Sequence, residues 1–273
     1  MVELNRVLIS GAEGMIGSEI DFGIKLTRKQ LDVTNIDSIK KALEGYKPSA
    51  VLCLSSINLR DSEKFPSRAL DVNVFGVYNL ALASKARNIP LVLISSGTVF
   101  NGSHSQVFSE KDTPNPQNVY GQTKYIAELL ALSINPKTII IRTGWLFGFK
   151  HKKNFFNKII DSARQNSEII ATNDQFGSPA YIKDFLIALK EALSNGKEGV
   201  YHIVNEGAAS GLDITKEVVS SLKSNSDIKE ISVSALGPDS PKRSLSEVLI
   251  SNKIKLRNWK AALKEYLVSV NGN

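Results

Sequence analysis

The sequence predicts an α/β protein built on a doubly wound parallel sheet, with a small C-terminal lobe attached to it. Three observations support this prediction. Short β-branched and apolar segments alternate with amphipathic segments of helical length, which is typical of parallel strands joined by crossover helices. A glycine-rich turn directly follows the first apolar segment. Beyond about Ala208 the chain becomes rich in Ser, Asp and Lys, and it is too short and polar there for an independent domain.

The apolar segments are short enough to be buried strands rather than helices. We expect strands at residues 6–10, 23–27, 50–54, 91–95, 138–142 and 199–205. We expect helices at 35–46, at 66–88, from Tyr120 onward, in the amphipathic segment before Gly199 and at 259–267, and a helix with a short strand within 151–172. The dinucleotide-binding core is therefore assigned to 1–150 and about 174–204, and a substrate-binding lobe to about 151–173 and 205–273.

Composition and charge argue against several classes of protein. The 273 residues carry a net charge of +7 that is spread along the chain, and no motif with interleaved aromatic residues suggests a nucleic-acid partner. There is no apolar run of membrane-spanning length and no charged, apolar leader, so we expect a cytoplasmic protein without a membrane partner. The three histidines and Cys53 lack metal-ligand spacing, so no metal is expected, and Cys53 is predicted to be a packed core thiol.

The glycine-rich turn GAEGMIG has the features of a dinucleotide-binding site. It joins the strand RVLIS to a helix start, as in the Rossmann fold. Gly11 would allow the tight turn, Gly14 would let backbone N–H groups approach a pyrophosphate, and the helix N-terminus would favour the negative charge. Gly17 makes the spacing GxxGxxG rather than GxGxxG. A glycine turn without a ligand is the alternative interpretation.

Two charged residues after the second strand bear on the choice of dinucleotide. Asp32 lies where an acidic side chain would bind near an adenine, although an Asp that caps the following helix fits the local sequence equally well. Arg28 would pair with a 2′-phosphate and so favour NADP, and a solvated loop arginine is the equal alternative. The expected cofactor is NADPH, with NADH as the other possibility.

Three residues from the fourth strand onward have the chemistry of an acid–base catalyst. Tyr120 and Lys124 lie one helical turn apart, so the ammonium group would stabilise the phenolate and lower its pKa. Ser96, at the strand end, would hold a substrate oxygen in the same site. A Tyr-x-x-x-Lys pair occurs readily by chance. Its weight comes from the order of glycine turn, strand-end hydroxyl and pair, because the carboxyl ends of such strands meet where ligands bind.

Several further segments are distinctive in combination. They are LDVTN, ALDVNVFGVYNLA, VFNG, NVYGQTK, RTGWLFG and DQFGSP. Together with the glycine turn they span most of the chain and resemble the extended short-chain dehydrogenases/reductases, above all the dTDP-4-dehydrorhamnose reductase branch. The resemblance implies reduction of the C4 ketone of a nucleotide-activated deoxysugar, in the first place dTDP-4-dehydro-L-rhamnose to dTDP-L-rhamnose in dTDP-rhamnose biosynthesis. The implied partner is a nucleotide sugar, and the expected assembly is a monomer or homodimer.

The resemblance also implies roles for individual residues. Ser96, Tyr120 and Lys124 match the catalytic triad of the family, and Trp145 matches a sugar contact. With the turn and the charged residues above, the expected cofactor site comprises Gly11, Gly14, Met15, Ile16, Gly17, Arg28, Asp32, Val33, Leu54, Ser55, Ser56, Tyr120 and Lys124. The expected substrate site comprises Ser96, Gly97, Thr98, Tyr120 and Trp145.

The chain departs from the family at positions that read the sugar. Where the family reads STDYVFDG this chain reads SSGTVFNG, so Gly97 and Thr98 replace an Asp and a Tyr. The usual Arg-Pro pair near the C-terminus is Ser240-Pro241 here, with Arg243 nearby. These departures bear on the identity of the sugar rather than on hydride transfer.

Two other functions are open at this point. One is a non-catalytic NADP-binding regulatory subunit similar to that of methionine adenosyltransferase. The other is a sugar-nucleotide epimerase or dehydratase, although a dehydratase would carry an Asp-Glu pair where Gly97 and Thr98 stand. The loop lysines Lys150, Lys152 and Lys153 would either contact a diphosphate or form a solvated run. Asp174 and Gln175 are expected to shape the loop on the substrate side.

Overall fold

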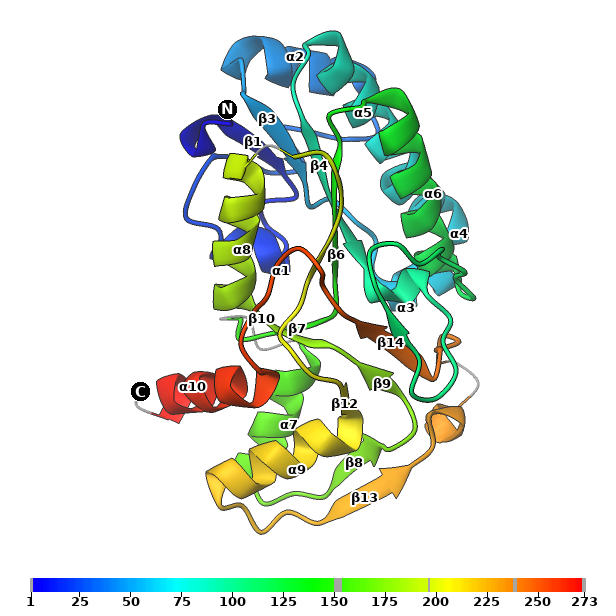
Figure 1. Ribbon diagram of the computed structural model, residues 1–273, viewed down its shortest axis with the longest axis vertical. Coiled ribbons are helices and arrows are strands. Elements are labelled where there is room, and N and C mark those ends of the chain that lie inside the picture. The colour runs from blue at the N-terminus through cyan, green and yellow to red at the C-terminus, as the bar shows by residue number, and fades with distance from the viewer. Residues whose placement is uncertain (1, 150–153, 196, 238–239, 272–273) are drawn as a thin grey trace.

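The computed structural model describes residues 2–149, 154–195, 197–237 and 240–271, and its centre is a six-stranded parallel sheet (Figure 1). The strand order is β11 (Gly199–Ile203), β6 (Ile139–Thr143), β4 (Leu91–Ser96), β3 (Ala50–Cys53), β1 (Val7–Ser10) and β2 (Ile24–Leu26). All six predicted strands are confirmed: the four inner strands are buried along almost their whole length, and the edge strands β2 and β11 are partly exposed. The doubly wound α/β architecture is likewise confirmed.

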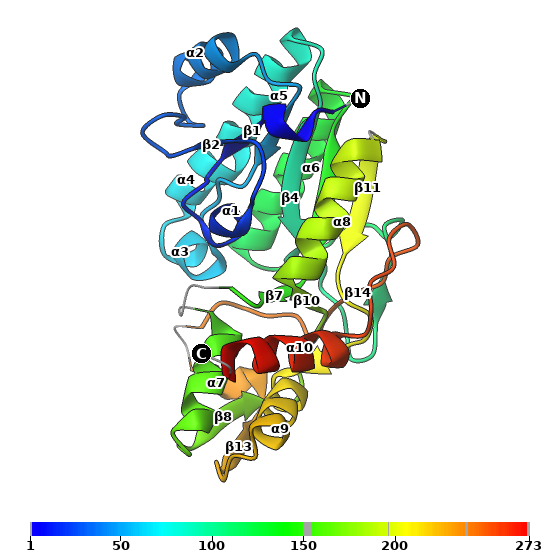
Figure 2. The same ribbon diagram turned by 90° about the vertical axis from the view of Figure 1, so that its left-hand side faces the viewer.

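Helices cover both faces of this sheet (Figure 2). One face packs against α2 (Ile36–Tyr46), α5 (Gly76–Ala86) and α6 (Val119–Ile134), and the other against α1 (Met15–Glu19) and α8 (Ile182–Asn195). Neighbouring residues of one strand point to opposite faces, so Leu8 packs on the face covered by α2, α5 and α6, and Ile9 packs on the face covered by α1 and α8. Asn35 caps α2 by accepting hydrogen bonds from the N–H groups of Asp37 and Ser38.

The helix predicted at 66–88 is divided into three segments. It begins with α4 (Pro66–Ala69), continues as a π-helical segment, η2 (Leu70–Phe75), and ends as α5. A short unpredicted helix, α3 (Leu59–Lys64), precedes it. The π-helical segment carries Asn73, which is fully buried and forms hydrogen bonds with the loop after β3. Such segments frequently lie at functional sites.

The remaining elements form a lobe at the carboxyl end of the sheet (Figure 1). A four-stranded sheet has the order β12 (Ala209–Ser210), β9 (Phe176–Gly177), β14 (Ser246–Leu249) and β5 (Val107–Phe108). Two strand pairs accompany it, β10 (Pro179–Tyr181) with β7 (Trp145–Phe147), and β13 (Ile228–Ile231) with β8 (Ile169–Thr172). The lobe helices are α7 (Phe155–Arg164), α9 (Gly211–Leu222) and α10 (Trp259–Asn271). Three 3₁₀ turns complete the chain: η1 (Leu4–Arg6), η3 (Gly97–Val99) and η4 (Val233–Leu236).

Three expectations about single groups and membrane contact are addressed by the described residues. Cys53 is fully buried, and burial raises the pKa of its thiol, as expected for a packed core residue. Among the residues that the structure describes, no helix has the length and apolar character needed to cross a membrane. The same residues contain no cluster of three His, Cys, Asp or Glu side chains arranged to hold a metal ion.

Candidate active site

The glycine turn lies at the point where the strand order reverses. Strand β1 pairs with β2 on one side and with β3 on the other, which is where ligands bind in open α/β sheets. Gly11 has φ +73°, and a Cβ there would lie 2.7 Å from the backbone N of Ser55. A Cβ at Gly17 would lie 2.7 Å from the backbone of Ala12. Both positions therefore require glycine, and the turn lies directly against the loop that follows β3.

A hollow of about 350 Å³ opens beside this turn, between the ends of β1, β2 and β3. It is lined by Gly11, Glu13, Gly14, Arg28, Leu31, Asp32, Val33, Leu54, Ser55, Ser56, Ile57, Arg68 and Val72. A second hollow of about 260 Å³ follows it toward β4 and β6. It is lined by Gly11, Gly14, Met15, Ile16, Gly17, Leu54, Ser56, Asn58, Ile94, Ser95, Ser96, Tyr120, Lys124, Thr143, Gly144 and Leu146.

The two hollows form one cleft, because both are lined by Gly11, Gly14, Leu54 and Ser56. Every residue of the expected cofactor site lines one or both of them. The cleft therefore brings together the glycine turn, the charged residues after β2 and the expected acid–base residues. Sequence reasoning missed Arg68, which comes from α4 and puts a second guanidinium group into the first hollow.

Asp32 and Arg28 both face the first hollow. The Asp32 carboxylate accepts hydrogen bonds from the N–H and the hydroxyl of Thr34, at 3.0 and 2.7 Å. These bonds, led by the hydroxyl, lower the pKa of Asp32. Asp32 thus stabilises the turn before α2, while Asn35 caps the helix itself. The Arg28 guanidinium lies 3.9 Å from the Asp32 carboxylate and is largely exposed, so it is available to an anion in the hollow.

Tyr120 is placed by the tight packing of helix α6 on the end of β4. A Cβ at Gly121 would lie only 2.3 Å from the carbonyl oxygen of Thr98, so the first turn of α6 rests on η3. Asn118 caps the helix by accepting a hydrogen bond from the N–H of Gly121 at 2.8 Å. The Glu63 carboxylate accepts a further bond from the N–H of Val119 at 2.7 Å.

The phenol of Tyr120 meets two hydroxyl groups. Burial raises the pKa of Tyr120 to about 12, side-chain hydrogen bonds with Ser56 and Ser96 lower it, and the Glu247 carboxylate raises it further. The sequence argument expected Lys124 to lower this pKa. In the protein chain alone, the pKa moves in the opposite direction, because desolvation of the phenolate is the largest contribution.

Lys124 is a buried cation that lines the same hollow as Tyr120. Its Nζ donates a hydrogen bond to the carbonyl oxygen of Ile94 at 2.5 Å. Burial lowers the pKa of Lys124, and the nearby Cys53 and Glu128 oppose that shift. The ammonium group is thus held at the end of β4, one helical turn from Tyr120 and facing the second hollow.

Asn73 ties the loop after β3 to helix α6 and was missed from the sequence. Its side-chain oxygen accepts hydrogen bonds from the N–H of Ile57 at 2.7 Å and from the hydroxyl of Ser56 at 3.2 Å. Its amide group donates to Thr123 at 3.0 Å and to the carbonyl of Ile57 at 3.2 Å. Because Ser56 also contacts Tyr120, Asn73 fixes one of the two hydroxyls at the phenol. The sequence signal that could have revealed its role was a polar amide next to the apolar residues of NVFG.

The other hydroxyl, Ser96, is linked to the lobe. Its Oγ accepts from the N–H of Thr98 at 3.1 Å and lies 3.0 Å from the Thr98 hydroxyl. Thr98 in turn donates to the carboxylate of Glu247, on β14, at 3.4 Å. The space beside Gly97 is filled from the same strand, since a Cβ there would lie 3.0 Å from the Glu247 carbonyl oxygen. Sequence reasoning missed Glu247, which looked like a polar position in a short tail segment.

Trp145, expected to contact sugar, lies beside the second hollow at the junction with the lobe. Its ring packs on Gly177, where a Cβ would lie 2.4 Å from the indole, and makes an edge contact with Phe155 at 6.3 Å. Its indole N–H hydrogen-bonds the Glu247 carboxylate. The cleft lining itself contains Leu146. The sugar contact of Trp145 stays a prediction.

Two other expectations concern loops on the substrate side. Asp174 accepts hydrogen bonds from the Ser232 hydroxyl at 2.5 Å and the N–H of Val233 at 2.6 Å, and so joins the loop before β9 to η4. Gln175 beside it is buried. The expected diphosphate contacts, Lys150, Lys152 and Lys153, lie outside the described residues.

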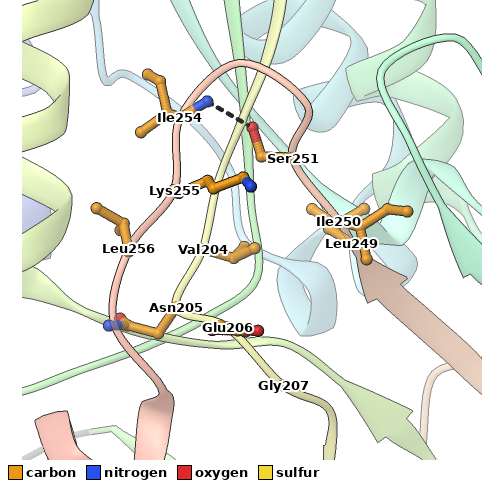
Figure 3. Close-up of a pocket in the computed structure, with 10 residues that line it drawn as sticks. All are labelled: Val204, Asn205, Glu206, Gly207, Leu249, Ile250, Ser251, Ile254, Lys255 and Leu256. Atoms are coloured by element: carbon orange, nitrogen blue, oxygen red, sulfur yellow. Dashed lines mark hydrogen bonds between the residues drawn. The ribbon is translucent and has the colours of Figure 1, made fainter.

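A separate hollow of about 310 Å³ lies between the chain after β11 and the chain after β14 (Figure 3). Two of its polar side chains, Asn205 and Ser251, take part in hydrogen bonds within the protein. Asn205 bonds the N–H of Tyr181, the carboxylate of Asp184 and the carbonyl of Arg257, and Ser251 accepts from the N–H of Ile254 at 3.0 Å. These bonds hold the C-terminal segment to the core, so we assign this hollow a structural role.

Comparisons with known proteins agree with this arrangement. A family model described as the RmlD substrate binding domain matches residues 5–271. The chain is 30% identical to dTDP-4-dehydrorhamnose reductase of Aggregatibacter actinomycetemcomitans, over 95% of this chain and 97% of that protein. It is 29% identical to the spore coat polysaccharide biosynthesis protein SpsK of Bacillus subtilis, over 97% of each chain.

A solved structure shows the same fold over the whole chain. It is dTDP-4-dehydrorhamnose reductase from Bacillus anthracis in complex with NADP, which superposes with a TM-score of 0.91 at 26% identity. The superposition covers 98% of this chain and all of that one. The family match spans nearly the full length, and with it the cleft residues and the lobe. The chain therefore belongs to the RmlD substrate binding domain family.

Proposed function

We propose that this protein uses NADPH to reduce the C4 ketone of a nucleotide-activated 6-deoxysugar, with dTDP-4-dehydro-L-rhamnose as the substrate and dTDP-L-rhamnose as the product. The observation that carries the proposal is the convergence of the glycine turn with Ser96, Tyr120 and Lys124 on one cleft. The name and bound NADP of the Bacillus anthracis neighbour support it.

The cleft residues fit a dinucleotide. Side chains at Gly11 and Gly17 would collide with backbone, so the bare turn leaves room for a pyrophosphate against β1. Arg28 and Arg68 put two guanidinium groups in the first hollow, which suits an adenosine carrying a 2′-phosphate. The bound cofactor supplies the hydride.

The acid–base chemistry belongs to the second hollow. Tyr120 donates its proton to the ketone oxygen, and Ser96 hydrogen-bonds the same oxygen and holds it in place. The buried Lys124 ammonium stabilises the phenolate that forms, and it would also meet the nicotinamide ribose. Gly97 and Thr98 leave no Asp-Glu pair for eliminating water, which argues against a dehydratase.

The diphosphate of the substrate has a candidate place beyond Glu63. A hollow of about 700 Å³ there is lined by Arg60, Glu63, Lys64, Leu236, Ser240 and Arg243. Three of these residues are cations, and the Nε of Arg243 is buried without a hydrogen-bond partner in the described chain. A diphosphate would supply the acceptor that this guanidinium group lacks.

The test is oxidation of NADPH with a panel of nucleotide 4-keto sugars, for the wild-type protein and Tyr120→Phe. General acids contribute about 10²–10⁴-fold to such reactions, so the variant should lose at least a hundredfold in kcat while its Kd for NADPH stays within about threefold. Tyr125→Phe, one turn further along α6, is the matched control and should keep normal turnover. Near-full turnover of Tyr120→Phe would sink the assignment of the acid. Tight NADPH binding without oxidation by any sugar would favour a regulatory subunit.

A further inference from the structure

A buried carboxyl group from the lobe adjoins the catalytic hydroxyls without lining the cofactor cleft. Glu247 is 7% exposed and lies on β14, far along the chain from β4. Its Oε2 lies 3.4 Å from the Thr98 hydroxyl, and that hydroxyl lies 3.0 Å from Ser96 Oγ. Ser96 and Tyr120 line the same hollow, and Ser96 is near enough to the phenol to lower its pKa as a hydrogen-bonding neighbour. Four groups with exchangeable protons therefore follow one another from the lobe to the phenol.

The polarity of this line depends on the proton at Glu247. Each hydroxyl donates one hydrogen bond and accepts two. When Glu247 is ionised, the Thr98 hydroxyl donates its hydrogen bond to Glu247 and cannot also donate to Ser96. When Glu247 is protonated, it donates to Thr98, so that Thr98 can donate to Ser96 and Ser96 to Tyr120. The link between Thr98 and Glu247 is long, at 3.4 Å, and such contacts in catalytic sites commonly shorten when the substrate closes the site.

The charged groups around Glu247 come from two directions. Arg243 lies on the same segment, with Arg60 of α3 behind it, and the phenol of Tyr120 lies across the site. The neighbouring elements β9, β5 and η3 contain no ionisable side chain. Burial raises the pKa of Glu247 to about 7, while Arg243 and hydrogen bonds from Trp145, Thr98 and Ser244 lower it. Glu247 can therefore both hold and release a proton near neutral pH.

We propose that Glu247 is a positioning residue that returns a proton to Tyr120, through Thr98 and Ser96, after each reduction. The inference rests on the proposed function. Tyr120 gives its proton to the ketone oxygen as the hydride arrives, which leaves a phenolate. Ser96 then gives its hydroxyl proton to the phenolate, Thr98 reprotonates Ser96, and Glu247 reprotonates Thr98. The Glu247 carboxylate finally takes a proton from solvent water, so one proton and one hydride are consumed per turnover.

The experiment separates the first turnover from those that follow. In the first, Tyr120 uses the proton that it already holds, whereas every later one needs the phenol restored. Rapid mixing of excess NADPH-loaded protein with substrate measures the first turnover, and steady-state oxidation measures kcat between pH 5.5 and 9. We expect Glu247→Gln and Thr98→Val to keep the first-turnover rate within about threefold and to lose at least tenfold in kcat at pH 6.5. Thr98→Ser keeps the hydroxyl group, so its kcat should be close to that of the wild-type protein.

The pH profile gives a second readout that a purely structural role would not move. Wild-type kcat should fall as pH rises through about 7, because Glu247 loses its proton there, and this fall should be missing from Glu247→Gln. The matched controls are Thr138→Val, a buried threonine just before β6, and Glu265→Gln, a surface carboxylate on α10. Both should keep the wild-type kcat and profile.

Each outcome decides the matter. Unchanged kcat in Glu247→Gln and Thr98→Val, beside a normal first turnover, would overturn the inference and leave the proposed function standing. Equal losses in the first turnover and in kcat would also overturn it, since they would mean that Glu247 only shapes the site. A wild-type protein with no first turnover for any 4-keto sugar would overturn the proposed function and this inference with it.

Discussion

Replacing Gly121 by alanine tests whether the contact between α6 and η3 sets the position of Tyr120. The added Cβ would lie 2.3 Å from the Thr98 carbonyl oxygen and 2.9 Å from Pro116 Cβ. The first of these atoms belongs to the backbone of η3, so no side-chain rotation relieves the clash. Overpacking of this kind costs about 1–3 kcal/mol. The helix must therefore move away from η3 and carry Tyr120 with it.

The effect on catalysis should exceed the effect on stability. A misplacement of about 1 Å in a catalytic group costs about 10²-fold in rate. Alanine is also the better helix former by about 1 kcal/mol, which offsets part of the clash in the unfolding free energy. We therefore expect Gly121→Ala to lose 0–2 kcal/mol of stability by urea unfolding, a range that follows from subtracting these two effects. Its kcat for NADPH oxidation should fall by about a hundredfold.

Gly45→Ala is the matched control for this experiment. Gly45 is also helical, in α2, but a Cβ there meets nothing within 4 Å. This substitution should therefore stabilise the protein by about 0.5–1 kcal/mol and leave turnover unchanged. A Gly121→Ala protein with wild-type kcat would refute the reasoning, because it would show that the clash is relieved without moving Tyr120.

Three further predictions concern the cofactor and the buried polar groups. The double variant Arg28→Ala with Arg68→Ala should raise the Kd of NADPH by about tenfold or more, since charge-assisted bonds contribute about 1.5–3 kcal/mol, and should leave the Kd of NADH within twofold in fluorescence titrations; equal losses would contradict it. Asn73→Ala strips the N–H of Ile57 of its partner, so urea unfolding should show a loss of about 1–3 kcal/mol together with weaker NADPH binding, and unaltered stability would exclude the bracing role. Burial raises the folded-state pKa of Glu247 from 4.5 to about 7, so the stability that Glu247 contributes is full below pH 4.5 and is lost as the pH rises through 7. In urea unfolding, the wild-type protein should therefore lose about 3 kcal/mol relative to Glu247→Gln between pH 4.5 and 8. Parallel stability curves for the two proteins would argue against the pKa shift.

The core of this protein could be predicted from the sequence because local pattern and global environment agree there. A run such as LVLI, at 91–94, is apolar at every position, as expected of a strand buried on both faces, and β4 is indeed buried along nearly its whole length. The glycine turn could be predicted for the same reason, because a Cβ at Gly11 or Gly17 would collide with nearby backbone atoms. The residues of the cofactor cleft follow from these two features and the order of the strands.

The lobe was harder to predict because its strands are short and pair across long distances. Strand β14 pairs with β5, and Val248 lies opposite Val107, although about 140 residues separate them. No periodicity within SLSEVLI shows that Glu247 is buried, because its burial depends on β9, β5 and η3 closing around it. The π-helical segment around Asn73 was missed because it lies inside a continuous run of helix, and no local pattern in LDVNVF distinguishes a π-helical turn from an α-helical one.

Gly97 and Glu247 are best understood as parts of one arrangement. The Glu247 carbonyl lies 3.0 Å from where a Cβ on Gly97 would be, which is tighter than most Cβ contacts. An aspartate at 97, as in the family pattern, would require the Glu247 backbone to move by a few tenths of an ångström, and the contact of 3.4 Å between Glu247 and Thr98 has little room for that shift. In this chain the carboxyl group next to the catalytic hydroxyls therefore comes from the lobe rather than from the end of β4. The departure at 97–98 is thus accompanied by a carboxyl group from the lobe, and this is the group that we propose returns the proton.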